Sequence, residues 1–241
     1  MKLKFKILYI FVLVLFSSLK AMGFDEEYYK LEYPQMKEEF FNQISSMLDV
    51  SFEKLNEERE FAKAFIEKSF LSSFQNLDKE ELERLSQIQT KYRIKNLFDF
   101  NEYYLKIQPI PKSMAIAQAL VESGTGTSRF TKEANNLFGE WTFGAKGLVP
   151  NERLPGKTHK IRIFDSLQDS VDSFVLNINR HRAYRYFRDK RLEAIKENKP
   201  MGIHAVDDLK AYSENGEYYT NTVKSVIKKY DLLRFDEIIK E

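Results

Sequence analysis

The nine glycines of this 241-residue chain are unevenly placed, and their placement constrains what the chain can fold into. None falls between Phe24 and Ser123, whereas six crowd between Gly124 and Gly156. Because glycine serves tight turns and positive φ angles, we expect long helices in the first stretch and a turn-rich segment in the second. Apolar residues at helical spacing within residues 36–76 favour the same interpretation.

Capping signals predict where further helices begin. Asp78 and Glu81 form a capping box that predicts a helix through about residue 94. Ser166 and Asp169 form a second one, which predicts a helix to about residue 180. Other helical segments are expected at residues 114–122, 128–134, 183–198, 203–212 and 217–230.

One stretch has the alternation of a β-strand. Residues 157–164 alternate between apolar and polar side chains, and with residues 140–150 they predict a small antiparallel hairpin or a three-stranded lobe. We therefore predict a mostly helical α+β fold with one small β lobe.

A shift in charge divides the chain. Residues 24–107 carry 12 basic and 18 acidic residues, whereas residues 108–241 carry 22 and 18. Pro109 and Pro111 coincide with the change. We predict a helical N-terminal region over residues 24–104, followed by a domain over residues 105–241. The N-terminal helices either pack against that domain or bind a protein partner of the cell envelope.

Composition excludes several function classes. The chain has 38 basic and 36 acidic residues, a balance that argues against a polybasic nucleic-acid binder. It has no cysteine, so disulfides, thiolate metal sites and cysteine nucleophiles are excluded. His159, His181 and His204 are far apart in sequence and form no close-spaced metal pair. We expect neither a metal nor an organic cofactor.

Residues 1–23 have the pattern of an export signal. Three lysines lie at the start, an apolar run covers residues 7–16, and Ala21 and Gly23 supply the small residues of a cleavage site. The apolar run is about half the length that a bilayer core requires. We expect the mature protein to work outside the cytoplasm, in the periplasm or cell envelope. An uncleaved membrane anchor is the alternative.

Glu122 is the residue most suggestive of chemistry. It ends an apolar stretch, residues 114–121, that contains one polar side chain, Gln118. A carboxyl group beside apolar walls resists ionisation, so its pKa rises and it can act as a general acid near neutral pH. The alternative is a helix-end carboxylate that is solvated or hydrogen-bonded to nearby backbone.

Glycoside hydrolysis usually requires a second carboxylate across the scissile bond. Glu140, Glu152 and Asp165 are the candidates within the turn-rich segment, and Asp165 fits better as part of the helix start beside Ser166. Trp141 offers a flat apolar face of the kind that packs against sugar rings, although a place in the core would also suit it.

Several motifs recur in order along the second half, and together they resemble the glucosaminidase domain of glycoside hydrolase family 73. They are Ala117-Gln118-Ala119-Leu120-Val121-Glu122-Ser123-Gly124, then Gly126-Thr127-Ser128, then Asn135-Asn136-Leu137-Phe138-Gly139. The resemblance covers about residues 105–232. It implies a lysozyme-like fold, a peptidoglycan substrate and Glu122 as the general acid.

The same resemblance implies a second acid in the β lobe, ahead of a glycine and of a strand that carries an arginine. Glu152 precedes Gly156 by four residues and Arg162 by ten, so it matches that place better than Glu140. The family's threonine before this acid is replaced by Pro150. A partly kept tyrosine-rich motif near the C-terminus makes two more residues candidates for lining the sugar cleft or for packing between the last helices: Tyr212 and Tyr219.

The leading hypothesis is an exported endo-β-N-acetylglucosaminidase that cleaves peptidoglycan glycan strands. Glu122 would protonate the glycosidic oxygen, and Glu152 would activate water or stabilise the developing positive charge. Two alternatives stay open. One is a lytic transglycosylase that uses Glu122 alone, and the other is a non-catalytic cell-wall-binding or scaffolding protein.

Overall fold

The structure is a computed structural model that describes residues 23–150, 156, 158–212 and 215–236. Residues 1–22 of the predicted export signal and the predicted second acid, Glu152, lie outside the described residues. Within the described part, no helix combines the length and the apolar character needed to cross a bilayer.

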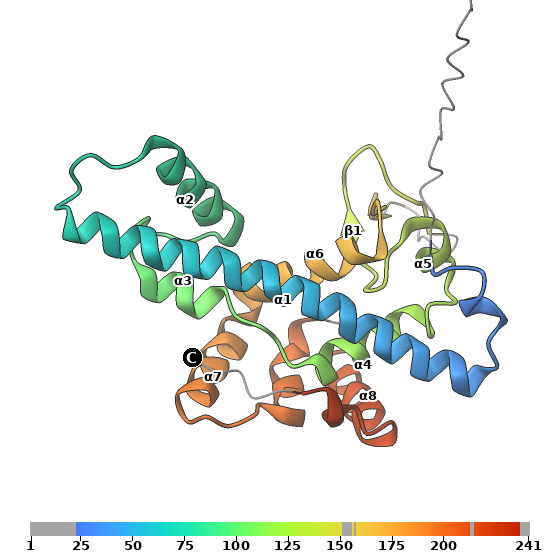
Figure 1. The fold of residues 1–241 in the computed structure, drawn as a ribbon. Helices are drawn as coiled ribbons and strands as arrows, with labels where there is room; N and C mark the ends of the chain where they lie inside the picture. Colours follow the sequence, from blue (N-terminus) through green and yellow to red (C-terminus); the bar gives the residue numbers. More distant parts are fainter. Residues whose placement is uncertain (1–22, 151–155, 157, 213–214, 237–241) are drawn as a thin grey trace, which may run out of the picture.

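The fold is mostly helical with one small sheet, as predicted (Figure 1). Strands β1 (Trp141–Thr142) and β2 (Lys160–Ile161) pair antiparallel, and an isolated bridge joins Leu148 to Ile161. The α-helices are α1 (Tyr33–Leu71), α2 (Lys79–Tyr92), α3 (Phe100–Lys106), α4 (Lys112–Ser123), α5 (Arg129–Ala134), α6 (Leu167–Arg180), α7 (Arg185–Lys196) and α8 (Gly216–Lys229). The 3-10 helices are η1 (Tyr28–Lys30), η2 (Arg182–Tyr184), η3 (Gly202–Tyr212) and η4 (Leu232–Phe235).

Local signals account for several helix ends. The Asp78 carboxylate accepts a hydrogen bond from the Glu81 backbone N–H at 2.9 Å and so caps α2. The Ser166 hydroxyl accepts one from the Asp169 N–H at 3.1 Å and caps α6. Gly124 adopts a left-handed conformation, with φ of 58°, where α4 ends. The predicted N-caps Asp78 and Ser166 are confirmed.

The 39-residue helix α1 crosses the molecule in front of α4 and α6, and α2 and α3 lie along its C-terminal half (Figure 1). Its buried face shares one continuous hydrophobic cluster with the second half of the chain. Members of that cluster on α1 include Phe40, Ile44 and Leu48, and members on α4 and α6 include Met114, Ile116 and Phe174. The N-terminal helices therefore pack against the second half.

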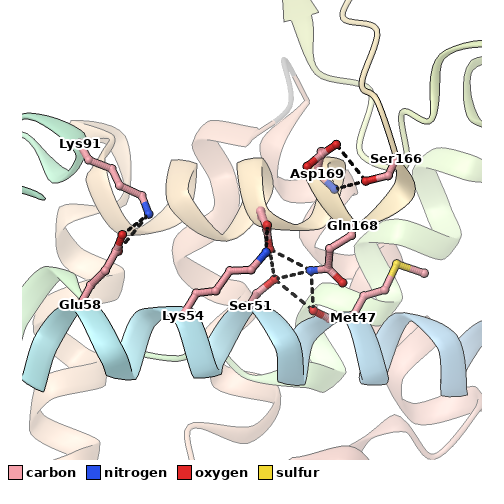
Figure 2. A network of polar contacts seen from close by, with 9 residues as sticks. Met47, Ser51, Lys54, Glu58, Lys91, Ser166, Gln168 and Asp169 are labelled. Atoms are coloured by element: carbon pink, nitrogen blue, oxygen red, sulfur yellow. Dashed lines mark hydrogen bonds and ion pairs between the residues drawn. The ribbon is translucent and has the colours of Figure 1, made fainter. Parts of the chain in front are cut away.

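A polar network reinforces the contact between α1 and α6 (Figure 2). The Gln168 amide donates to the Met47 carbonyl at 3.0 Å and to the Ser51 hydroxyl at 3.1 Å. Ser51 donates to the Asp172 carboxylate at 2.6 Å, and Lys54 forms an ion pair with the same carboxylate. These directional bonds fix the position of α1 along α6, which apolar packing alone would leave less specific.

The segment before α1 packs on the turn that follows α4. The Tyr28 hydroxyl donates to the Thr125 carbonyl at 2.7 Å, and the Tyr29 hydroxyl donates to the Gly126 carbonyl at 3.1 Å. The buried Phe24 ring stacks on Tyr28 with 4.3 Å between centroids. A Cβ atom added to Gly126 would lie 2.3 Å from the Phe24 ring. This turn is therefore held by residues about one hundred positions earlier in the chain.

We predict that Gly126→Ala destabilises the protein by about 2–4 kcal/mol, because it combines a strained backbone with a clash against Phe24. Gly202→Ala is the matched control, since Gly202 also has a positive φ, of 53°, but open space around its Cβ position. Thermal unfolding should show a larger loss for Gly126→Ala. Equal losses of stability in the two variants would contradict the packing of Phe24 on this turn.

Candidate active site

Glu122 lies in the last turn of α4, whose residues 112–119 are all buried. Burial raises the pKa of its carboxyl group above the ordinary value, as the apolar sequence context predicts. The loop that follows α5 approaches the carboxylate closely, because a Cβ atom on Gly139 would lie 3.4 Å from Glu122 Oε2. The group is thus partly desolvated, and the backbone at Gly139 lies against it.

Tyr219 of α8 hydrogen-bonds to the Glu122 carboxylate and partly offsets the effect of burial on its pKa. The Tyr219 hydroxyl in turn accepts a hydrogen bond from the Gln118 amide at 3.0 Å. Gln118 lies one helical turn before Glu122 on α4, so both ends of this short relay come from the same helix. The one polar side chain in the apolar stretch therefore orients the tyrosine that contacts the candidate acid.

Tyr212 lies beside Tyr219, with the two rings stacked at 5.2 Å between centroids. Its hydroxyl donates to the Phe138 carbonyl at 2.8 Å and so connects η3 to the loop that faces Glu122. Burial raises the pKa of both tyrosines, so both remain protonated donors near neutral pH. Tyr219 is 7% exposed and belongs to the hydrophobic core, whereas Tyr212 is half-buried at its edge.

Glu140 precedes β1 and is held by its surroundings. Its carboxylate Oε2 accepts hydrogen bonds from Ser173 at 2.9 Å and from Arg162 at 3.4 Å. Its backbone N–H and carbonyl both bond to the Asn136 side chain. Burial raises the pKa of Glu140, although Ser173 and Arg162 oppose the shift. Its Oε1 is buried and has no hydrogen-bond partner within the described residues.

Glu122 and Glu140 both lie near Tyr212, since the charge of each contributes to the raised pKa of that tyrosine. Tyr184 of η2 is near as well. Burial and the charge of Glu140 raise its pKa to about 12. The structure thus brings together the candidate acid, Glu140 and a group of tyrosines from three separate segments.

Trp141 lies on β1 and is 57% exposed. One face of its ring stacks on His159, with 4.1 Å between centroids. An indole held in this way at the surface of the β lobe presents its other face to solvent, which suits contact with a sugar ring. Asp165 directly precedes the α6 cap Ser166, where the sequence placed it.

Sequence reasoning did not identify Ser173 and Tyr184 as site residues. Ser173 lies within α6, where nothing local distinguishes it from a surface serine. Tyr184 occurs in the run His181-Arg182-Ala183-Tyr184-Arg185. Its position near Glu140 depends on how η2 packs against η3, which no local pattern encodes.

Part of the chain is similar to known proteins. The family described as mannosyl-glycoprotein endo-beta-N-acetylglucosaminidase, or Glucosaminidase, matches residues 99–232. The chain is 35% identical to Protein bax of Escherichia coli (strain K12) over 147 residues, which cover 58% of this chain and 52% of that protein. The similarity thus spans about half the length of that relative.

The matched region includes both ends of the site described above, from α4 with Glu122 to α8 with Tyr219. It also covers more than half of the chain, so the resemblance drawn from the sequence motifs is confirmed. The chain belongs to the glucosaminidase family.

Proposed function

We propose that this protein is an exported peptidoglycan hydrolase that cleaves glycan strands as an endo-β-N-acetylglucosaminidase. The observation that carries the proposal is the Glu122 carboxyl group, whose pKa burial raises at the end of a buried helix. Membership of the glucosaminidase family supports the type of bond that is cleaved. Since peptidoglycan lies outside the cytoplasm, the proposed substrate agrees with the export signal expected from residues 1–23.

In the proposed mechanism Glu122 enters the reaction protonated. It donates its proton to the glycosidic oxygen as the bond from that oxygen to the anomeric carbon breaks. Positive charge then develops on the sugar ring, and a second carboxylate either stabilises this charge or removes a proton from the attacking water. Water adds to the anomeric carbon, so that one strand is released with a new reducing end.

Tyr219 contributes by orienting Glu122. Its hydroxyl hydrogen-bonds to the Glu122 carboxyl group and accepts a hydrogen bond from Gln118. Tyr219 thereby holds one oxygen of the carboxyl group, and the other oxygen carries the proton toward the substrate. Trp141 is the proposed platform for a sugar ring, because its outer face is open. Tyr212 is proposed to line the cleft where η3 meets the loop at Phe138.

Glu152 remains the proposed second carboxylate, and Glu140 is the alternative. Glu140 already has two neighbours that satisfy one of its oxygens, Ser173 and Arg162. Such a group is suited to holding β1 against α6. A base that activates water needs freer access to solvent.

We expect Glu122→Gln to lower the rate of glycan cleavage by about a hundredfold or more, because an amide has no acidic proton to donate. The measurement is mass spectrometry of the ends formed from purified peptidoglycan. Reducing N-acetylglucosamine ends from the wild type alone support the proposal. Ends with 1,6-anhydromuramic acid would identify a lytic transglycosylase. If Glu122→Gln had the same effect on cells as the wild type, the protein would have a binding role.

We expect Tyr219→Phe to shift the alkaline limb of the profile of kcat/KM against pH to higher pH. The Tyr219 hydroxyl favours the charged form of Glu122 and thereby lowers its pKa. Removing it should raise that pKa further, so the protonated acid persists to higher pH. Phe keeps the packing of the ring. An unchanged limb would mean that Glu122 is not the group that titrates there.

Substitution of the two candidates for the second acid should have opposite effects on cleavage rate and on stability. Glu152→Gln should lower the cleavage rate by about a hundredfold while leaving the melting temperature nearly unchanged. Glu140→Gln should instead lower the melting temperature, since Arg162 would lose its charged partner. Cleavage rate and thermal unfolding are measured for both variants. A folded but inactive Glu140→Gln beside an active Glu152→Gln would reverse the assignment.

A further inference from the structure

A groove of about 570 Å³ lies between the N-terminal helices and the side of α6. Its walls come from α1, α2, the segment after β2 and α6, so neither half of the chain forms it alone. Five of its lining residues are cations, Lys54, Lys91, Lys146, Arg162 and Arg180, and three are aspartates, Asp165, Asp169 and Asp172, so positive charge is in excess. Figure 2 shows Lys54 of α1 extending toward α6 and Lys91 of α2 extending toward Glu58 of α1.

The cations differ in how their charge is compensated. Lys54 pairs with Asp172, Lys91 with Glu58 at 2.7 Å and Arg162 with Glu140 at 3.4 Å. Arg180 instead donates to a backbone carbonyl, that of Lys91, at 3.5 Å. Lys146 is exposed, and no carboxylate of the described residues pairs with it or with Arg180.

Positive charge continues beyond the groove at the Arg180 end. Burial lowers the pKa of Arg180, and the neighbouring charges of Arg93 and Arg162 lower it further, against the opposing effect of Glu140. Burial likewise lowers the pKa of His181. Four guanidinium groups add to that effect: Arg93, Arg182, Arg188 and Arg180.

At the Arg180 end, guanidinium groups lie close enough to disfavour the charged forms of Arg180 and His181, and a surface of this kind attracts anions. The position of the groove suggests which anion. Arg162 and Ser173 line it and both bond to Glu140, so its occupant would lie beside Glu140, the alternative second carboxylate. The same groove has apolar walls as well, including Leu55, Phe164 and Leu176.

We propose that this groove binds the peptide stems of peptidoglycan, with Lys146 and Arg180 contacting their free carboxylates. Stem peptides combine carboxylates with small apolar side chains. The groove offers apolar residues and an excess of cations over its three aspartates. The inference rests on the proposed function, because it assumes a peptidoglycan substrate. It gives the N-terminal helices a part in substrate choice, since α1 and α2 form one wall.

The test compares glycan strands that carry their peptides with strands stripped of them, both prepared free of phosphate-containing wall polymers. The ratio of the two cleavage rates is measured for the wild type and for the Lys146→Gln/Arg180→Gln double variant. We expect the wild type to cleave peptide-bearing strands faster. In the double variant the ratio of the two rates should fall about tenfold, which corresponds to the free energy of one charge-assisted hydrogen bond.

Lys196→Gln/Lys228→Gln is the matched control. Lys196 and Lys228 are exposed cations in the last turns of α7 and α8, just as Arg180 ends α6, so their loss reproduces the loss of two charges and of an interaction with a helix end. This variant should keep the wild-type ratio. If the folded double variant also keeps that ratio, the groove does not bind the stems, even though cleavage itself supports the proposed function.

A binding experiment separates failure of this inference from failure of the proposed activity. Glu122→Gln protein, with and without the double substitution, is sedimented with the two kinds of strand. Stronger binding to peptide-bearing strands that the double substitution abolishes would support the groove even if no cleavage is found. Equal binding to both kinds of strand would overturn it.

Discussion

The burial of α4 is the constraint on which the rest of the structure depends. Its residues 112–119 are buried, and it contacts α1, α8, η3 and η4. Each large apolar side chain so buried contributes roughly 1.5–3 kcal/mol. The same burial removes water from the end of the helix, where Glu122 lies, and raises the pKa of its carboxyl group. Stability and the proposed acid chemistry therefore have one physical origin.

Both ends of α4 are held by distant parts of the chain. At its start, the Asp236 carboxylate accepts hydrogen bonds from the Ser113 backbone N–H at 2.8 Å and from the Ser113 hydroxyl at 2.7 Å. At its end, Tyr28 and Tyr29 bind the carbonyls of the turn that follows Glu122. A proton donor must be held in a fixed orientation, and these contacts limit the movement of the helix that carries it.

The N-terminal helices thus have more than one structural role. They cover the buried face of the second half, and they hold the turn behind Glu122 through the segment that precedes α1. They also form one wall of the groove beside Glu140. The hydrogen bonds that join Ser51 of α1 to Gln168 and Asp172 of α6 fix these helices to the second half of the chain in one position. The division at residue 104 proposed from charge remains a prediction about folding units.

The sequence by itself determined most of the helices, the caps Asp78 and Ser166 and the α+β class, and it singled out Glu122 as the candidate acid, because these depend on residue type and spacing within a few turns of chain. It also predicted a small antiparallel β lobe, whose two strands are two residues each. Only the tertiary structure decided that Tyr219 contacts Glu122, and that Ser173 and Arg162 hold Glu140. It also decided that cations from α1, α2 and α6 line one groove. These partners are separated by 11 to about 130 positions in the chain, and they meet only because α1, α6 and α8 pack around one buried helix.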